Sequence, residues 1–296
     1  MKATRQFGVQ RDRWMAAATL VASTLLGCEL FRPPAPSTAT ARAIDREESG
    51  VVALATTEDG DASHVTLCSG ALVASNLVLT ARHCISRAIT ARPFCDAHGR
   101  SHNGPHFAAD ASPSSVAVYV GEHVRLDRDQ PRAHGVQTLH PAGHVLCDAD
   151  VAFLILDRPL VGVAVLPLRL VGSVSSGDHV RPVGFGGGAA MTVGDRVGRT
   201  GSRVLSIGPA ANASTGAVLG PREFEVDHAT CRGDSGGPAI DAVTGEVVGV
   251  VSRGASCSSP GNHVYTRIDS YAALAQLALR EASRVAAVQE SIAAVR

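Results

Sequence analysis

Short apolar, β-prone runs separated by Gly, Pro, Ser and Asp recur along most of this 296-residue chain. Two of them, 71–73 and 77–79, lie close together, and 151–156 is wholly apolar. Short runs bounded by turn-forming residues are typical of strands, and a purely apolar one is typical of a buried strand. The 30 glycines favour sheets and turns in the same way. We therefore expect an all-β protein of one domain or two small fused ones.

Composition excludes several classes of function. The 27 acidic side chains balance the 27 Lys and Arg side chains, and aromatic residues make up only 4%. A nucleic-acid-binding protein is expected to carry basic patches or aromatic stacking platforms, so we expect no nucleic-acid partner. We also expect no cofactor and no metal. His98, His102 and His106 are spaced by four residues, but Pro105 and the neighbouring glycines indicate a solvated loop rather than a metal-binding helix face.

Both ends of the chain differ from this β-rich part. Residues 1–28 are typical of an export signal, because a basic region precedes an apolar stretch too short to cross a bilayer as a helix. The stretch ends in Leu-Leu-Gly-Cys, which resembles the bacterial lipoprotein box and predicts lipidation of Cys28. An ordinary secretory signal with an incidental cysteine is the alternative. Residues 29–43 form a Pro-rich tether or propeptide, and 269–296 show the three- and four-residue apolar spacing of an amphipathic helix.

The run from Cys231 to Pro238 places Ser235 among glycines. Gly233 lacks a Cβ, so the backbone can turn sharply there and direct N–H groups to one spot. Ser235 would expose its Oγ at that spot, and the N–H groups of Gly233 and Ser235 could bind the oxyanion of a tetrahedral acyl intermediate. The alternative is a glycine-rich turn with an incidental serine.

Two further residues complete a catalytic pattern. A serine hydroxyl needs an adjacent base near neutral pH, and His83 is expected at the end of the strand pair formed by 71–73 and 77–79. Asp150 opens the apolar run at 151–156, where a buried carboxylate would require a partner. Each residue alone has an ordinary structural interpretation. Their order along the chain together with Ser235 indicates a base, an orienting acid and a nucleophile.

The chain resembles the trypsin/chymotrypsin family of serine proteases over most of its length. The matching segments are 68–73, 79–84, 140–141, 150–154, 183–186, 231–238, 250–254 and 263–266. The resemblance implies a triad of His83, Asp150 and Ser235, an oxyanion hole at Gly233 and Ser235, and hydrolysis of protein or peptide substrates through an acyl-enzyme. A catalytically inactive homologue acting as a surface-binding lipoprotein is the alternative.

The same resemblance implies an architecture. The expected fold is two six-stranded antiparallel β-barrels with a C-terminal α-helix. The protease domain would span 44–275, with barrel one at 44–160 carrying His83 and Asp150 and barrel two at 161–268 carrying Ser235. The site would lie in the crevice between the barrels. The second half of the helix, from about residue 284, extends beyond the usual end of the family and either packs on the body or engages another chain.

Six cysteines remain once Cys28 is set aside, which suits three disulfides. The family joins the pairs that match Cys68–Cys84 and Cys231–Cys257, and elimination leaves Cys95–Cys147. Disulfides require an oxidising compartment, so we expect an extracytoplasmic protein, either secreted or an envelope lipoprotein. A membrane contact is expected only through Cys28, and a monomer is expected.

The resemblance also assigns a substrate pocket. Ala229 occupies the floor position where trypsin has an aspartate, so cleavage after Lys or Arg is not expected. Gly254 leaves one wall open, His263 replaces a usual glycine, and Thr230 and Ser252 complete the lining. Small or medium uncharged residues are expected before the scissile bond. An acidic residue paired with His263 and Thr230 is the alternative.

Activation in the family pairs a freed N-terminal Ile or Val with the aspartate before the serine, here Asp234. The usual Ile-Val-Gly-Gly is absent, and Ile44 is the nearest match, with Arg42 as a nearby processing site. We therefore expect Ile44 to become the buried terminus. Arg253 replaces a common tryptophan, which leaves the neighbouring subsites open.

Overall fold

A computed structural model describes residues 46–58, 61–90, 92–187, 194–227, 230–254, 257, 259 and 261–294. The predicted signal and tether, with Cys28 and Ile44, lie outside the described residues, and so does Ala229. The predictions for these segments therefore stay predictions.

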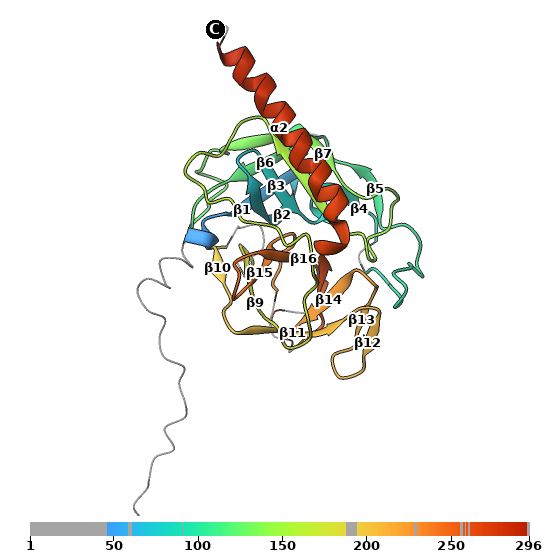
Figure 1. Cartoon of the computed structure of the whole chain (residues 1–296). Coiled ribbons are helices and arrows are strands. Elements are labelled where there is room, and N and C mark those ends of the chain that lie inside the picture. The colour runs from blue at the N-terminus through green and yellow to red at the C-terminus, as the bar shows by residue number, and fades with distance from the viewer. Residues whose placement is uncertain are drawn as a thin grey trace, which may run out of the picture. The chain divides into compact units, whose positions relative to one another are not determined.

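The first half of the domain forms a closed antiparallel β-barrel in the order β1-β2-β3-β8-β7-β6 (Figure 1). Its strands are β1 Val51–Glu58, β2 Asp61–Ala74, β3 Leu77–Thr80, β6 Val116–Tyr119, β7 Ala133–Leu139 and β8 Ala152–Leu156. Strand β8 is buried throughout, as its apolar sequence predicts. Leu154 belongs to the cluster that fills the barrel, whereas Phe153 and Ile155 face a second cluster shared with the rest of the domain. This arrangement explains why β8 carries no polar residue.

The second half forms another six-stranded antiparallel barrel, closed by the pairing of β15 with β9. Its strands are β9 His179–Gly184, β11 Ser202–Ile207, β14 Glu223–Val226, β15 Pro238–Asp241, β16 Val247–Gly254 and β17 His263–Arg267. The two-residue strand β10, Val197–Gly198, extends this sheet beside β9. The predicted pair of six-stranded barrels is confirmed.

Short elements decorate the barrels. β4 Ser86–Ala88 pairs with β5 Phe107–Asp110, and β12 Ala210–Asn212 pairs with β13 Ala217–Leu219. The 3₁₀ turns are η1 Arg82–Cys84, η2 Pro113–Ser115 and η3 Asp269–Tyr271. The expectation of a solvated histidine loop is wrong for His106. This residue is only 1% exposed, and its Nδ1 accepts the Leu146 N–H at 2.8 Å.

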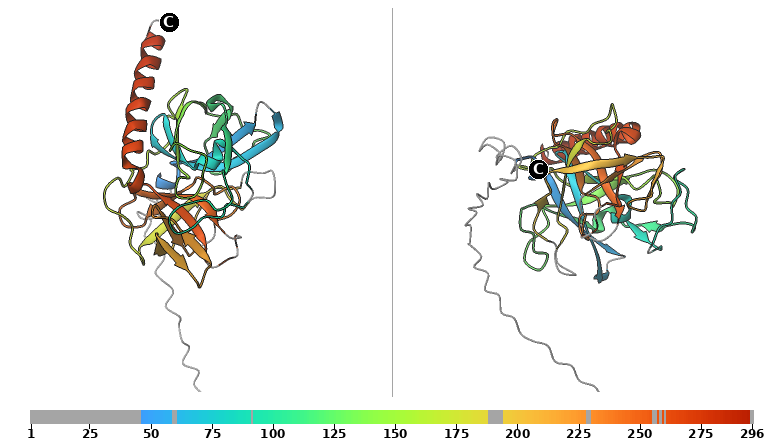
Figure 2. Two further views of the ribbon diagram at one scale, coloured as in Figure 1. Left: turned by 90° about the vertical axis from the view of Figure 1, so that its right-hand side faces the viewer. Right: turned by 90° about the horizontal axis from the view of Figure 1, so that it is seen from below.

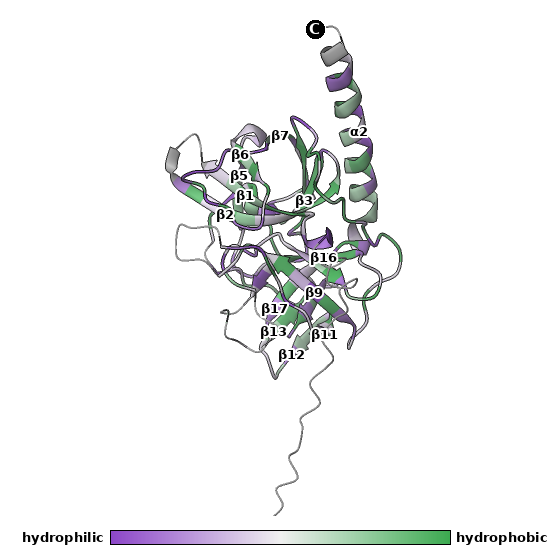
Figure 3. Ribbon diagram, turned by 90° about the vertical axis from the view of Figure 1, so that its left-hand side faces the viewer, coloured by the Kyte–Doolittle hydropathy of each residue, from purple (hydrophilic) through white to green (hydrophobic). Residues whose placement is uncertain are grey.

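The C-terminal helix α2, Ala272–Ala294, packs on β3 and β8 and then projects beyond them (Figures 1 and 2). Its buried face carries Ala275, Ala278 and Ala282, whose small side chains allow close approach to the barrel. Figure 3 shows apolar strands in both barrels and alternating polar and apolar bands along α2. Among the described residues, no helix has the length and apolar character needed to span a bilayer.

Candidate active site

His83 lies in the 3₁₀ turn η1, directly after strand β3. The preceding Arg82 is only 2% exposed. It fixes this turn, because its guanidinium donates to the carbonyl oxygens of Pro141 (3.0 Å) and Gly143 (2.5 Å). The same guanidinium lies over the Phe107 ring, 4.9 Å from its centre. The position of His83 is therefore set by β3 on one side and by a buried arginine anchor on the other.

Asp150 immediately precedes β8 and is fully buried. Its Oδ2 lies 2.8 Å from His83 Nδ1, and its Oδ1 accepts the His83 backbone N–H at 3.0 Å. The Ser252 hydroxyl donates to Oδ2 at 2.7 Å. The structure thus brings His83 and Asp150 together, and it places the predicted pocket residue Ser252 on the aspartate.

The interaction between His83 and Asp150 outweighs the effect of burial on the pKa of each residue. Burial lowers the pKa of His83, but the charge and hydrogen bond of Asp150 outweigh it, so the pKa lies above its usual 6.5. Burial raises the pKa of Asp150, and His83 and Ser252 reverse that effect, so its pKa lies below its usual value. A carboxylate facing Nδ1 selects the tautomer with its proton on Nδ1. Nε2 then carries the lone pair that can accept a proton.

Ser235 lies in the turn between β14 and β15, and its own N–H and that of Gly233 have no acceptor among the described residues. The amides of Asp234, Gly236 and Gly237 donate to the carbonyl oxygens of Cys231, Val251 and Asp234. In the described part of the chain, no acceptor takes the N–H of Gly233 or Ser235. Gly233 has a φ of 101°, which favours glycine. Two unpaired amides beside a hydroxyl suit the binding of an oxyanion.

The turn that carries Ser235 is anchored to the first barrel. Ser69 N–H donates to the Ser235 carbonyl oxygen at 2.8 Å, and Ser69 Oγ donates to the Gly233 carbonyl oxygen at 2.7 Å. The Sγ of Cys84, the residue after His83, lies 3.6 Å from the Ser235 carbonyl oxygen. A Cβ on Gly236 would collide with the backbone of Ala81. Ser235 therefore lies against the segment that flanks His83.

The Ser235 hydroxyl forms no hydrogen bond with His83 within the described ranges. Catalytic hydrogen bonds are often long or poorly aligned in substrate-free structures and tighten when substrate binds. The arrangement is thus an imidazole oriented by a buried carboxylate. Next to it lies a turn with a half-buried serine, in which the amides of Gly233 and Ser235 have no acceptor among the described residues.

The sequence model of the Trypsin family matches residues 42–275. The chain belongs to the trypsin family. A solved structure with the same fold is that of a scabies mite inactivated protease paralogue, S-I1, with a TM-score of 0.60 and 19% sequence identity. The match covers 80% of this chain and 96% of that chain. At this identity the likeness concerns the fold alone.

In this trypsin-family chain, the predicted pocket residue His263 is fully buried and both its ring nitrogens are engaged. Nδ1 accepts from the Thr230 N–H (3.3 Å) and lies 3.1 Å from its hydroxyl, while Nε2 lies 3.0 Å from the Ser259 carbonyl oxygen. A carbonyl cannot donate, so Nε2 carries the proton. A Cβ on Gly254 would lie 2.8 Å from the Asn262 carbonyl oxygen, so a side chain there would displace the wall.

Arg253 has a partner that the sequence did not reveal. Its guanidinium binds both carboxylate oxygens of Glu223, at 2.5 and 2.7 Å, and donates to the Val218 carbonyl oxygen at 2.9 Å. Glu223 is fully buried, and it also accepts the backbone N–H groups of Asp148 and Gly220. Arg253 is therefore paired within the domain and is not a free cation for substrates.

The disulfides are Cys68–Cys84, Cys95–Cys147 and Cys231–Cys257. The sulfurs of the first pair and the His83 ring nitrogen lie within 4.8 Å of one another. A metal would require thiolates, and disulfide sulfurs are not thiolates, so this cluster does not fit a metal site.

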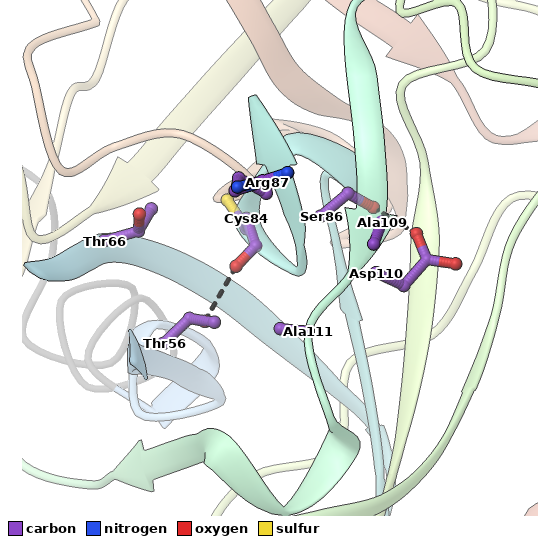
Figure 4. Close-up of a pocket in the computed structure, with 8 residues that line it drawn as sticks. All are labelled: Thr56, Thr66, Cys84, Ser86, Arg87, Ala109, Asp110 and Ala111. Atoms are coloured by element: carbon purple, nitrogen blue, oxygen red, sulfur yellow. Dashed lines mark hydrogen bonds between the residues drawn. The ribbon is translucent and has the colours of Figure 1, made fainter. Parts of the chain in front are cut away.

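A pocket lies beside the turn that carries Cys84, and Thr56 Oγ1 donates to the Cys84 carbonyl oxygen there at 2.7 Å (Figure 4). Its lining residues are Thr56, Thr66, Cys84, Ser86, Arg87, Ala109, Asp110 and Ala111. Neither His83 nor Ser235 is among these residues, so the pocket is not assigned to the candidate active site.

Proposed function

We propose that this protein is a serine endopeptidase that acts through an acyl-enzyme. Ser235 is the nucleophile, His83 the general base, Asp150 the group that orients His83, and the N–H groups of Gly233 and Ser235 the oxyanion hole. The observation that carries this proposal is the buried Asp150 carboxylate on His83 Nδ1, beside a turn in which the amides of Gly233 and Ser235 have no acceptor among the described residues.

The reaction follows from these positions. Ser235 Oγ attacks the carbonyl carbon of the peptide bond while its proton passes to His83 Nε2. The oxygen that becomes negative is stabilised by the two amides. The C–N bond then breaks, and His83 returns the proton to the leaving amine. Water, deprotonated by His83, attacks the acyl-enzyme and releases the carboxylic acid and the Ser235 hydroxyl.

The substrate preference we propose is a small or medium uncharged residue before the scissile bond. His263 supports it, because both nitrogens of this buried ring already have partners and offer no free donor to an acidic side chain. Ala229 supports it by sequence, since no aspartate is present there to bind Lys or Arg.

The surroundings of the enzyme follow from its disulfides. Three disulfides are stable only where thiols are oxidised, so we propose that the protein acts outside the cytoplasm on protein or peptide substrates. The lipid anchor at Cys28 and the monomeric state remain predictions of the sequence.

Substitution Ser235→Ala tests the function directly. Wild-type protein should react with a fluorophosphonate probe at Ser235 and cleave members of a peptide library after small or medium uncharged residues. Ser235→Ala should not react and should lose kcat by a factor on the order of a million, as nucleophile loss does in another triad enzyme. The Tm of Ser235→Ala should stay close to that of wild type, because the Ser235 hydroxyl makes no hydrogen bond within the described residues.

Ser214→Ala is the matched control, because Ser214 is exposed on the turn between β12 and β13. It should label and hydrolyse like wild type. A folded wild-type protein that neither labels nor cleaves any peptide would contradict the proposal and favour an inactive homologue. A strong preference for Lys or Arg would contradict the substrate class alone.

A further inference from the structure

Asp234, the residue before Ser235, is a buried carboxylate with a cation from within the domain. Its Oδ2 lies 2.9 Å from Arg199 Nη2, and the two side chains are 2% and 18% exposed. Its Oδ1 accepts the Gly186 N–H and its Oδ2 the Cys231 N–H, each at 2.7 Å. A buried charge without a counter-charge is costly, so this carboxylate depends on the arginine.

Arg199 is itself held by the second barrel. It follows β10, and its backbone N–H donates to the Pro182 carbonyl oxygen in β9 at 2.8 Å. The Ser202 hydroxyl donates to the Arg199 carbonyl oxygen at 3.3 Å. Its guanidinium also lies 3.8 Å from the sulfur of Cys231. Arg199 is thus fixed by backbone pairing and does not reach Asp234 as a loose surface side chain.

The position of Asp234 decides the geometry of the candidate oxyanion hole. Its carboxylate accepts the N–H of Cys231, three residues away, and closes the turn Cys231–Ser235. The Gly237 N–H donates to its carbonyl oxygen at 2.8 Å on the other side. The free amides of Gly233 and Ser235 flank it on either side in the chain. A shift of Asp234 would therefore move both amides.

We propose that Arg199 is a positioning residue that sets the oxyanion hole through Asp234, so that the site does not require a freed N-terminus. This proposal rests on the serine endopeptidase function proposed above. In the described part of the chain, Arg199 is the side-chain cation that pairs with Asp234. The segment that follows Ile44 is also already engaged, since Arg181 binds Glu47 at 2.5 Å and Glu48 at 3.4 Å.

The test compares Arg199→Gln, Arg199→Lys and the control Arg203→Gln in the full chain, with the N-terminus of each preparation determined by sequencing. Arg203 is exposed on β11. Arg199→Gln should lose kcat by about 100-fold or more with a smaller change in KM, comparable to removal of an oxyanion donor. Arg199→Lys should recover part of kcat, Arg203→Gln should match wild type, and wild type should label with fluorophosphonate while uncut.

Hydrogen exchange of the amides in 230–238 separates this proposal from the proposed function. Exchange should accelerate in Arg199→Gln and not in Arg203→Gln, whether or not the protein hydrolyses peptides. If wild type fails to label both uncut and after a cut that exposes Ile44, but the exchange result holds, the function fails and the positioning role stands.

Two outcomes would overturn the positioning role. One is exchange and kcat in Arg199→Gln that match wild type. The other is labelling only after a cut that exposes Ile44. If Arg199→Gln does not fold, the uncut wild-type labelling still decides whether a freed terminus is needed.

Discussion

Asp148 turns the chain between the Cys95–Cys147 disulfide and Asp150, with a φ of 62° that aspartate and asparagine tolerate better than most residues. Its Oδ1 accepts the Arg222 N–H, and its carboxylate packs against Gly99 and Gly220. Burial, followed by the negative charge of Glu223, raises the pKa of Asp148 to about 6, although Arg222 acts in the opposite direction. The residue two positions before Asp150 thus carries a carboxylate that folding makes harder to ionise.

Substitution Asp148→Asn should change how stability depends on pH. The folded-state pKa is raised to about 6 from 3.8, so protonation stabilises the fold below about pH 4 and this contribution is lost as pH rises through about 6. Asn keeps the acceptor and the turn but cannot ionise. As the pH rises from about 4 to neutral, the free energy of unfolding of the variant should increase relative to wild type by on the order of 1–3 kcal/mol, allowing for solvent screening.

Thermal unfolding of both proteins across this pH range measures the difference. Asp127→Asn is the control, because Asp127 is largely exposed (73%). A difference between wild type and Asp148→Asn that does not vary with pH would contradict the raised pKa.

The hydrogen bonds of helix α2 to the first barrel extend as far as Gln289 in the described residues. Asn76 donates to the Ala282 carbonyl oxygen at 2.9 Å, and Gln289 donates to the Asp157 carbonyl oxygen at 2.8 Å. Glu290 and Ser291 are exposed. These contacts lie at the start of β3 and the end of β8, which are the ends away from His83 and Asp150. The helix therefore supports the barrel at a distance from the candidate site.

Removal of 291–296 should leave stability unchanged, whereas removal of 283–296 should cost roughly 1–3 kcal/mol, because Val285 and the Gln289 hydrogen bonds are lost. Denaturant unfolding measures the cost. Hydrolysis per folded molecule should be equal in all three proteins. A loss of activity in the shorter variant at full folding would contradict the separation of helix and site.

The sequence predicted elements and motifs with local signals. The apolar run of β8, the Gly233–Ser235 turn and the helical spacing after Tyr271 each lie within a few residues, and each appears in the structure where it was expected. The closed barrels followed from the resemblance and not from periodicity. Local patterns were sufficient to predict features that are formed by residues within a few positions of one another in the chain.

The partners of three side chains outside the family motifs were not predicted. Arg253 clamps Glu223, Arg199 binds Asp234, and His106 is buried by a bond from Leu146. Nothing in the residues beside each of these side chains identifies its partner, because the pairing arises only when the strands assemble. The ion pairs of Arg253 with Glu223 and of Arg199 with Asp234 therefore required the structure.

The two barrels share one hydrophobic core in addition to their own interiors. A single cluster includes Leu77 and Phe153 from the first barrel, Phe185 and Val250 from the second, and Ala278 from α2. Burial of apolar surface between the barrels makes each of them dependent on the other. The whole domain should therefore unfold as one unit.

Calorimetry of the oxidised protein should give one transition with equal van't Hoff and calorimetric enthalpies. Ser235→Ala should behave in the same way, which serves as the control for autolysis. Two separable transitions, one assigned to each barrel, would contradict the shared core.

The ion pair between Arg199 and Asp234 has a consequence for timing. A counter-charge supplied from within the barrel is present as soon as the chain has folded, and no later cut is needed to deliver it. A hydrolase completed in this way would be competent as soon as it folds. Restraint would then have to come from the place where folding happens, or from an inhibitor made alongside it.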